Sequence, residues 1–257
     1  MIRRYLGIIN CLFVLALLTA SIGCCHGKIP NISQKNNALK IEKIKDNSGF
    51  HFQSAVFIFV SPQPDPLMSS IFGESWPEIQ RSFVHTGSGV VISTDKLGSD
   101  VVTAGHVCQQ SGPNGEPTPW NIKINVFDWM GNEHEAIIIK YSLNPDLCLL
   151  RIPGKILPES VDIADRDPKL GANITNTGYP LGVYIPGAPL MFNGTYAGTD
   201  IDGDHIYTIP VAPGSSGSAV LNEDGEIIGI IFAAVAEFPH VAIATPWHKI
   251  NKFLYEK

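Results

Sequence analysis

The chain contains 257 residues, enough for one enzyme-sized domain with additional segments. Its formal net charge is −6, and its 18 lysine and arginine residues form no basic stripe. The composition therefore argues against a protein that binds nucleic acid.

The N-terminus has the pattern of an export signal. Two arginines at positions 3 and 4 precede an apolar run from Leu6 to Ile22. A membrane-spanning helix is the alternative, but the run is short and contains Asn10, which favours a signal peptide over residues 1–23. We therefore expect an exported protein, located in the periplasm or on the cell surface.

The end of this signal resembles a bacterial lipobox. In Ser21-Ile22-Gly23-Cys24, the cysteine would be lipidated and would become the first residue of a membrane-attached lipoprotein. Ser21 replaces the usual leucine, so ordinary signal cleavage is the alternative. Residues 24–50 are rich in Lys, Asn and Gln and predict a flexible tether, which places the folded domain at 51–257.

The folded region predicts an all-β architecture. Short segments rich in β-branched and aromatic residues alternate with Gly, Pro, Asn and Asp turns. This spacing, with little helical periodicity, predicts two antiparallel barrels. The strands predicted for the first barrel are 54–61, 83–93, 101–104, 121–129, 133–141 and 147–152.

Two segments differ from this pattern. Pro62–Ser82 contains four prolines and is predicted to be a long surface loop. At the end of the chain, Thr245 and Pro246 predict the N-cap and first position of a helix. The apolar face of that helix would consist of Trp247, Ile250 and Leu254.

Three short motifs contain the residue types of nucleophilic catalysis. His106 follows a strand in Thr103-Ala104-Gly105-His106-Val107, Asp146 precedes a strand, and Ser216 lies in Gly214-Ser215-Ser216-Gly217. A serine hydroxyl needs a base to take its proton, and a carboxylate can fix the tautomer of an imidazole base. The serine motif alone would indicate only a turn. The order His, Asp, Ser is that of the chymotrypsin type of triad.

These motifs resemble the chymotrypsin-like serine proteases, and more closely the protease domain of the HtrA-type family. T-A-G-H-V resembles the family's T-A-x-H-V, and D-L-C-L-L-R-I resembles D-x-A-x-L-K-I. Four further family motifs are matched in order by residues 171–182, 214–222, 225–230 and 241–246. The resemblance implies two six-stranded antiparallel β-barrels, with the active site in the cleft between them and a short C-terminal helix.

The resemblance also implies a role for each matched residue. Ser216 would be the nucleophile, His106 the general base and Asp146 the residue that orients it. The N–H groups of Gly214 and Ser216 would form the oxyanion hole. The residues matched to the substrate pocket are small or apolar, which favours cleavage after small aliphatic residues over cleavage after Lys or Arg. They lie in the segments 209–212, 232–234 and 241–242, and those expected to form the pocket are Pro210, Ala212, Phe232, Ala233, Ala234 and Ala242.

The sequence departs from the family pattern in three places. Ser218 replaces a second glycine, and we expect its side chain to narrow the floor of the site. Ser215 stands where zymogen-activated relatives have an aspartate that pairs with a new N-terminus, so activation by proteolysis is not expected. No PDZ sequence follows the matched region, so recognition through a PDZ domain is not expected either.

Two cysteines lie beside the matched triad. Cys108 and Cys148 each follow a triad residue by two positions, and His106 must hydrogen-bond to Asp146 in such a triad. The segments that contain the cysteines would therefore run close together, and an exported protein meets an oxidising compartment. We predict a Cys108–Cys148 disulfide, with two buried free cysteines as the alternative.

The sequence thus predicts an exported serine endopeptidase that cleaves polypeptides through an acyl-enzyme intermediate. The alternative is a catalytically weak or inactive protease-fold lipoprotein that binds unfolded or partner polypeptides. No cofactor or metal is predicted, because the histidines lack ligand spacing and Asp200–Asp204 favours a hairpin turn over a calcium loop. The sequence does not predict an oligomeric state.

Overall fold

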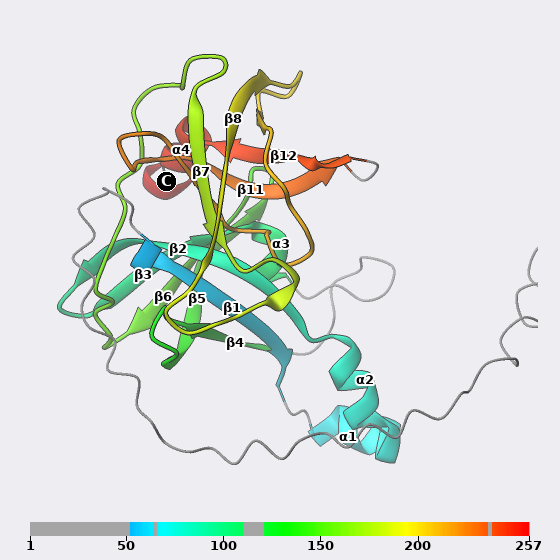
Figure 1. Ribbon diagram of the computed structural model, residues 1–257. Helices are drawn as coiled ribbons and strands as arrows, with labels where there is room; N and C mark the ends of the chain where they lie inside the picture. The colour runs from blue at the N-terminus through cyan, green and yellow to red at the C-terminus, as the bar shows by residue number, and fades with distance from the viewer. Residues whose placement is uncertain (1–51, 64–65, 110–120, 236–237, 257) are drawn as a thin grey trace, which may run out of the picture. The chain divides into compact units, whose positions relative to one another are not determined.

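The computed structural model describes residues 52–63, 66–109, 121–235 and 238–256, all within one compact unit, Lys43–Lys257 (Figure 1). The predicted signal peptide, Cys24 and the tether lie outside the described residues. Within the described ranges, no helix is both long and apolar enough to cross a membrane.

Six strands form the first barrel, and all their pairings are antiparallel. The barrel closes in the order β1-β2-β3-β6-β5-β4. Its core consists of fully buried aliphatic side chains such as Val56, Val101 and Leu150, because alternate residues of each strand point inward. The strands are β1 (Ala55–Pro62), β2 (His85–Asp95), β3 (Gly98–Thr103), β4 (Ile122–Phe127), β5 (Glu133–Leu143) and β6 (Asp146–Pro153).

The second barrel is also closed and antiparallel, in the order β10-β11-β12-β9-β8-β7. Its core includes Tyr207, Ile209 and Ile228. The prediction of two six-stranded barrels is confirmed. The strands are β7 (Asn173–Gly178), β8 (Leu190–Thr199), β9 (His205–Tyr207), β10 (Ala219–Leu221), β11 (Ile227–Val235) and β12 (Phe238–Pro246).

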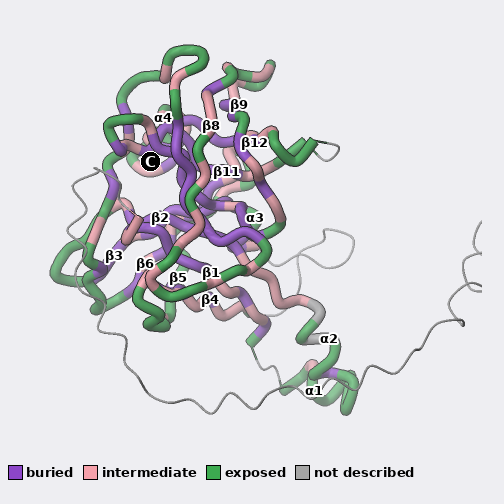
Figure 2. The backbone as a smooth tube through the Cα atoms, viewed as in Figure 1, coloured by how far each residue is buried: buried purple, intermediate pink, exposed green. Residues whose placement is uncertain are grey.

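A third group of buried side chains joins the two barrels. Val90 and Leu147 from the first barrel pack with Ile230 from the second. The C-terminal helix α4 (Trp247–Tyr255) adds Ile250 and Phe253 to the same group. Figure 2 shows buried segments running through the strands of both barrels, with exposed residues concentrated in the connections. This shared core fixes the two barrels relative to each other.

The prediction of a loop over Pro62–Ser82 is wrong for most of its length. Pro62 still belongs to β1, and the segment 66–82 forms two short helices, α1 (Pro66–Phe72) and α2 (Trp76–Ser82), joined by the 3-10 turn η2 (Gly73–Ser75). Its prolines are compatible with helix because Pro66 and Pro77 occupy the first turn, where a missing N–H breaks no helical hydrogen bond.

The C-terminal helix begins later than predicted. Pro246 is its N-cap in an extended conformation, and Thr245 still belongs to β12, where it pairs with Ile230. The most buried side chains of the helix are Ile250 and Phe253, rather than Leu254. Three further short elements lie in the described chain: η1 (Phe52–Ser54), α3 (Gly105–Cys108) and η3 (Pro180–Gly182).

Candidate active site

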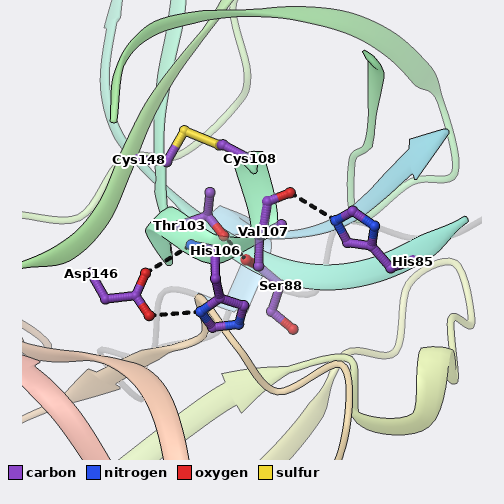
Figure 3. Close-up of a disulfide and its surroundings, with 8 residues drawn as sticks. All are labelled: His85, Ser88, Thr103, His106, Val107, Cys108, Asp146 and Cys148. Carbon is purple, nitrogen blue, oxygen red and sulfur yellow. Dashed lines mark hydrogen bonds and ion pairs between the residues drawn. A yellow bond between two sulfur atoms is a disulfide. The ribbon is translucent and has the colours of Figure 1, made fainter. Parts of the chain in front are cut away.

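His106 and Asp146 contact each other at the end of the first barrel. His106 lies in the single-turn helix α3, and Asp146 is the first residue of β6. Asp146 Oδ1 accepts the backbone N–H of His106 at 2.8 Å, and Oδ2 lies 2.7 Å from His106 Nδ1 (Figure 3). A carboxylate can only accept, so Nδ1 donates to it, and in the neutral imidazole the lone pair is then on Nε2. The His106 side chain is 43% exposed, which leaves Nε2 available as a base.

Gly105 allows this close approach. A Cβ atom at this position would lie 2.0 Å from the carbonyl oxygen of Ser142 and 2.8 Å from Asp146 Oδ1. Both distances are far inside van der Waals contact, so only glycine fits. The glycine in T-A-G-H-V is thus explained by the packing of α3 against the turn between β5 and β6.

A disulfide joins Cys108 of α3 to Cys148 of β6, with the two Cα atoms 6.4 Å apart (Figure 3). Both cysteines are buried. The covalent bond therefore connects the element that contains His106 to the strand that begins with Asp146.

The loop that contains Ser216 lies directly against the first barrel. The N–H of Ser88 in β2 donates to the carbonyl oxygen of Ser216 at 2.8 Å. At Gly217, a Cβ atom would lie 2.1 Å from both the Ser88 carbonyl oxygen and Thr103 Oγ1. Thr103 precedes His106 by three residues, so Ser216 and His106 lie in neighbouring segments. The contacts of the described residues include no hydrogen bond between their side chains.

Four of the six backbone N–H groups in this loop are hydrogen-bonded within the protein. Within the described stretch from Ala212 to Ser218, the N–H groups of 212, 215, 217 and 218 each donate to a protein oxygen, and Pro213 has no N–H. Only the N–H groups of Gly214 and Ser216 have no protein acceptor there. Gly214 has φ = +93°, a conformation that favours glycine. The two donors predicted to form an oxyanion hole are therefore the two that are free to bind a ligand.

A cavity of about 330 Å³ opens beside Ser216. Four of the six predicted pocket residues line it: Ala212, Phe232, Ala233 and Ala234. The structure does not bring Pro210 or Ala242 to this cavity. Ala242 is fully buried in the core of the second barrel, and Pro210 is partly buried elsewhere.

Val211, from the matched segment 209–212, also lines the cavity. The sequence does not identify the remaining lining residues, which are Pro213, Ser215, Ile231, Val235 and Pro239. Ile231 and Val235 belong to β11 and Pro239 belongs to β12. The pairing register of these two strands shifts beside Ile231 and Val235. A register shift decides which side chains face the cavity, and apolar periodicity alone does not reveal it.

Ser218 does not narrow the site, contrary to expectation. Its side chain is fully buried and accepts a hydrogen bond from Asn176 Nδ2 at 2.9 Å. It packs beside Gly178, where a Cβ atom would lie 2.7 Å from that of Ser218. The serine side chain thus points toward β7 rather than into the cavity.

The aspartates at 200–204 form a turn between β8 and β9. Asp200 Oδ1 accepts the N–H groups of Asp202 and Asp204, each at 2.9 Å. Lys249 Nζ donates to Asp204 Oδ1 at 2.8 Å, so a protein cation already neutralises this carboxylate. In the part of the chain that the structure describes, no group of side chains is arranged to hold a metal ion.

Comparison with known proteins agrees with this arrangement. A family model described as "Trypsin-like peptidase domain" matches residues 87–230, which is more than half of the chain. The chain belongs to the trypsin-like peptidase family. The matched range includes His106, Asp146 and Ser216.

Three relatives connect this trypsin-like peptidase to named proteases. Serine protease Rv3671c of Mycobacterium tuberculosis is 29% identical over 172 residues, covering 63% of this chain and 38% of that protein. The periplasmic pH-dependent serine endoprotease DegQ of Escherichia coli is 30% identical over 171 residues, covering 64% and 35%. A glutamyl endopeptidase of Staphylococcus epidermidis is 28% identical over 169 residues, covering 58% and 55%. The predicted resemblance to HtrA-type proteases is confirmed, although the chain spans only part of the length of each relative.

Two solved structures have the same fold. The serine endoprotease of Yersinia pestis has a TM-score of 0.58 at 22% identity, covering 79% of this chain and 62% of the other. The M. tuberculosis protease Rv3671c, in an inactive mutant form, has a TM-score of 0.55 at 20% identity, covering 79% and 86%. At these identities the similarity establishes the two-barrel fold.

Proposed function

We propose that this trypsin-like peptidase is a serine endopeptidase that cleaves polypeptides through an acyl-enzyme on Ser216. His106 Nε2 would take the hydroxyl proton as Ser216 Oγ attacks the scissile carbonyl carbon. The proton would then pass to the leaving amine as the peptide bond breaks. Water, deprotonated by the same nitrogen, would hydrolyse the acyl-enzyme and restore Ser216.

The observation that supports this proposal most strongly is the pattern of free donors in the serine loop. Only the N–H groups of Gly214 and Ser216 are free in a stretch whose other N–H groups are hydrogen-bonded. These two donors, one of which belongs to Ser216 itself, are suited to the negative charge that develops on the substrate oxygen. Asp146 would stabilise the imidazolium that forms on His106 at the same time.

The triad is tested by replacing its residues one at a time. Ser216→Ala, His106→Ala and Asp146→Ala should each lower casein hydrolysis by roughly 10⁴-fold or more, because the three residues act as one unit. Ser93→Ala is a control, since Ser93 is an exposed serine whose hydroxyl donates to Asp100 Oδ2. Near-parent activity in Ser216→Ala, with an unchanged far-UV circular dichroism spectrum, would refute the proposal.

For the substrate, we propose a preference for a small aliphatic residue on the acyl side of the cut. None of the described side chains that line the cavity is charged, so a buried Arg, Lys or Glu would lack a partner. Cleavage after glutamate is the competing specificity, given the glutamyl endopeptidase among the relatives. A peptide library that varies this position should favour Val, Ala or Ile, and a profile dominated by Glu, Arg or Lys would contradict the assignment of the cavity.

A substitution in the cavity sharpens this test. Ala233→Phe should fill the space and reduce cleavage after Val by about 10-fold or more, while cleavage after Ala is retained. The Ala substrate is an internal control for the catalytic residues. Equal losses for both substrates would show that Ala233 does not set the preference.

For location, we propose export followed by lipid attachment at Cys24, in keeping with the N-terminal pattern and with a relative named as periplasmic. A lipidated protein should partition into the detergent phase, and Cys24→Ser should move it to the aqueous phase. Cys25→Ser is the matched control and should leave partitioning unchanged. An aqueous parent protein with a mature N-terminus at another residue would indicate ordinary signal cleavage.

A further inference from the structure

Ser88 contacts the catalytic loop from the opposite barrel, although it contributes no atom to the proposed chemistry. It lies in β2 between two glycines and is fully buried. Its N–H donates to the carbonyl oxygen of Ser216 at 2.8 Å, and its hydroxyl donates to that of Gly214 at 2.8 Å. The two residues held in this way are the two whose N–H groups form the proposed oxyanion hole.

We propose that Ser88 is a positioning residue that holds Gly214 and Ser216, which supply the two donors of the proposed oxyanion hole, in their active conformation. This inference rests on the proposed function and extends it to a residue outside the triad. Each peptide plane contains the C=O of one residue and the N–H of the next, so the conformation of a residue is fixed only when the planes on both sides of it are held.

Both peptide planes that flank Gly214 are held from outside the loop. The carbonyl oxygen of Pro213 accepts the N–H of Leu181, and the carbonyl oxygen of Gly214 accepts the hydroxyl of Ser88. Glycine is the residue with the greatest backbone freedom, so loss of either bond would release Gly214 to rotate. Leu181 thus holds the plane that contains the Gly214 N–H, and Ser88 holds the plane that follows it.

The planes on either side of Ser216 are held in a similar way. The carbonyl oxygen of Ser215 accepts the N–H of Ser218 at 2.9 Å, and the carbonyl oxygen of Ser216 accepts the N–H of Ser88. One bond comes from within the loop and the other from the first barrel. Ser88 thus holds the peptide plane that follows each of the two donors, through its hydroxyl at Gly214 and its backbone N–H at Ser216.

The orientation of Ser88 is itself determined by two further contacts. Its hydroxyl oxygen accepts the N–H of Tyr179 at 2.9 Å, which directs its single proton toward Gly214. Its carbonyl oxygen accepts Thr103 Oγ1 at 2.7 Å, and Thr103 lies three residues before His106 (Figure 3). Ser88 therefore links the segment that contains the base to the loop that contains the nucleophile.

Ser99 provides a matched control for the substitution of Ser88. It is also a fully buried serine of the first barrel, and its hydroxyl makes the same two kinds of bond. It donates to the carbonyl oxygen of Lys155 at 2.9 Å and accepts the N–H of Leu157 at 2.9 Å, both outside the candidate site. Ser88→Ala and Ser99→Ala hence remove equivalent hydroxyl hydrogen bonds, and only the first releases the carbonyl oxygen of Gly214.

The test measures kcat and KM of the parent protein and the two variants with a peptide ester substrate. The thermal stability of each protein is measured separately. We expect both substitutions to lower Tm by similar amounts. Ser88→Ala should also lower kcat by roughly 10- to 100-fold with little change in KM, because misplaced donors weaken transition-state binding more than substrate binding. A peptidyl trifluoromethyl ketone, which forms an oxyanion at the nucleophile, should lose affinity in proportion to kcat. Ser99→Ala should leave kcat, KM and this affinity near parent values.

Equal kcat values for Ser88→Ala and Ser99→Ala would overturn the inference while leaving the proposed function intact. The proposed function would instead be refuted if the Ser216→Ala variant hydrolysed the substrate as fast as the parent protein. If Ser88→Ala does not fold, Ser88→Cys replaces it, because a thiol keeps the shape with a weaker donor. A kcat for Ser88→Cys between those of the parent and a Ser216→Ala variant is expected, and a parent-like kcat would overturn the inference.

Discussion

The first barrel contains two histidine–aspartate pairs of similar geometry and different surroundings. His106 Nδ1 lies 2.7 Å from Asp146 Oδ2, and His134 Nε2 lies 2.9 Å from Asp128 Oδ2. The His106 side chain is 43% exposed, whereas that of His134 is 10% exposed. Only the first pair faces the serine loop, so the second is a natural comparison for the proposed chemistry.

The bonds around Asp128 show what the second pair does. Its Oδ1 accepts hydrogen bonds from the backbone N–H groups of Met130 and Asn132. Its Oδ2 accepts hydrogen bonds from Asn132 Nδ2 and His134 Nε2. The carboxylate therefore closes the turn between β4 and β5. The carboxylate of Asp146, in contrast, has the backbone and ring of His106 as its partners. A histidine–aspartate bond indicates catalysis only where the second ring nitrogen is accessible and faces a nucleophile.

The largest expected difference between the pairs is in activity. His106→Ala should reduce casein hydrolysis by roughly 10⁴-fold, while His134→Ala should retain activity within about threefold. The reason is that only His106 can exchange a proton with Ser216 in the proposed mechanism. Initial rates at matched folded-protein concentrations measure the difference, and comparable losses in the two variants would remove the distinction.

The disulfide is the next difference, because it braces the His106 pair and not the His134 pair. The bond joins Cys108 to Cys148, which are separated by 40 positions in the sequence, and so closes a long loop. Its loss through a Cys108→Ala, Cys148→Ala double substitution should lower the free energy of unfolding by about 2–4 kcal/mol. Urea titration measures this change. A non-reduced peptide digest of the purified protein checks the bond, and two alkylatable thiols would contradict it.

A smaller effect is expected from removing the second pair. His134→Ala leaves a buried carboxylate with one partner fewer, which should lower the free energy of unfolding by about 1–3 kcal/mol. The exposed control His240→Ala should change it by less than about 0.5 kcal/mol. Urea midpoints that coincide for the two variants would show that the His134 bond adds nothing to stability.

The smallest expected effect is a change in how the thermal stability depends on acidic pH. Burial raises the pKa of Asp128, but hydrogen bonds from His134 and Asn132 outweigh it, and the net pKa lies below the ordinary value of 3.8. A lowered pKa in the folded state gives stability that is present above 3.8 and is lost as the pH falls through the folded value. Asp128→Asn should therefore flatten the decrease in Tm below pH 4. An unchanged acid slope would contradict this assignment.

Much of the fold and the candidate site follows from local sequence patterns. The strands were predictable because β-branched segments alternate with turn residues, and the pairing of His106 with Asp146 followed from the family motifs. The helices at 66–82 were missed because four prolines indicated a loop, although two of them stand in first turns. The signal peptide and Cys24 are still predictions.

Other features depend on contacts between distant segments. Ala242 was assigned to the pocket by sequence match, but the strand register turns it into the core of the second barrel. Ser218 was expected in the site, but Asn176 binds its hydroxyl from another strand. Ser88 was overlooked because a serine between two glycines has no distinctive chemistry until Gly214 and Tyr179 are seen beside it.

The central claim is that Ser216 is the nucleophile, and covalent labelling tests it most directly. A fluorophosphonate probe should form one adduct per molecule, and fragmentation of the labelled peptide should place it on Ser216. The neighbouring Ser215 should not react, because it is buried and its hydroxyl accepts the N–H of Ala212. We predict that Ser216→Ala abolishes the adduct. An adduct of equal yield in that variant, or a folded parent protein that does not react, would contradict the account.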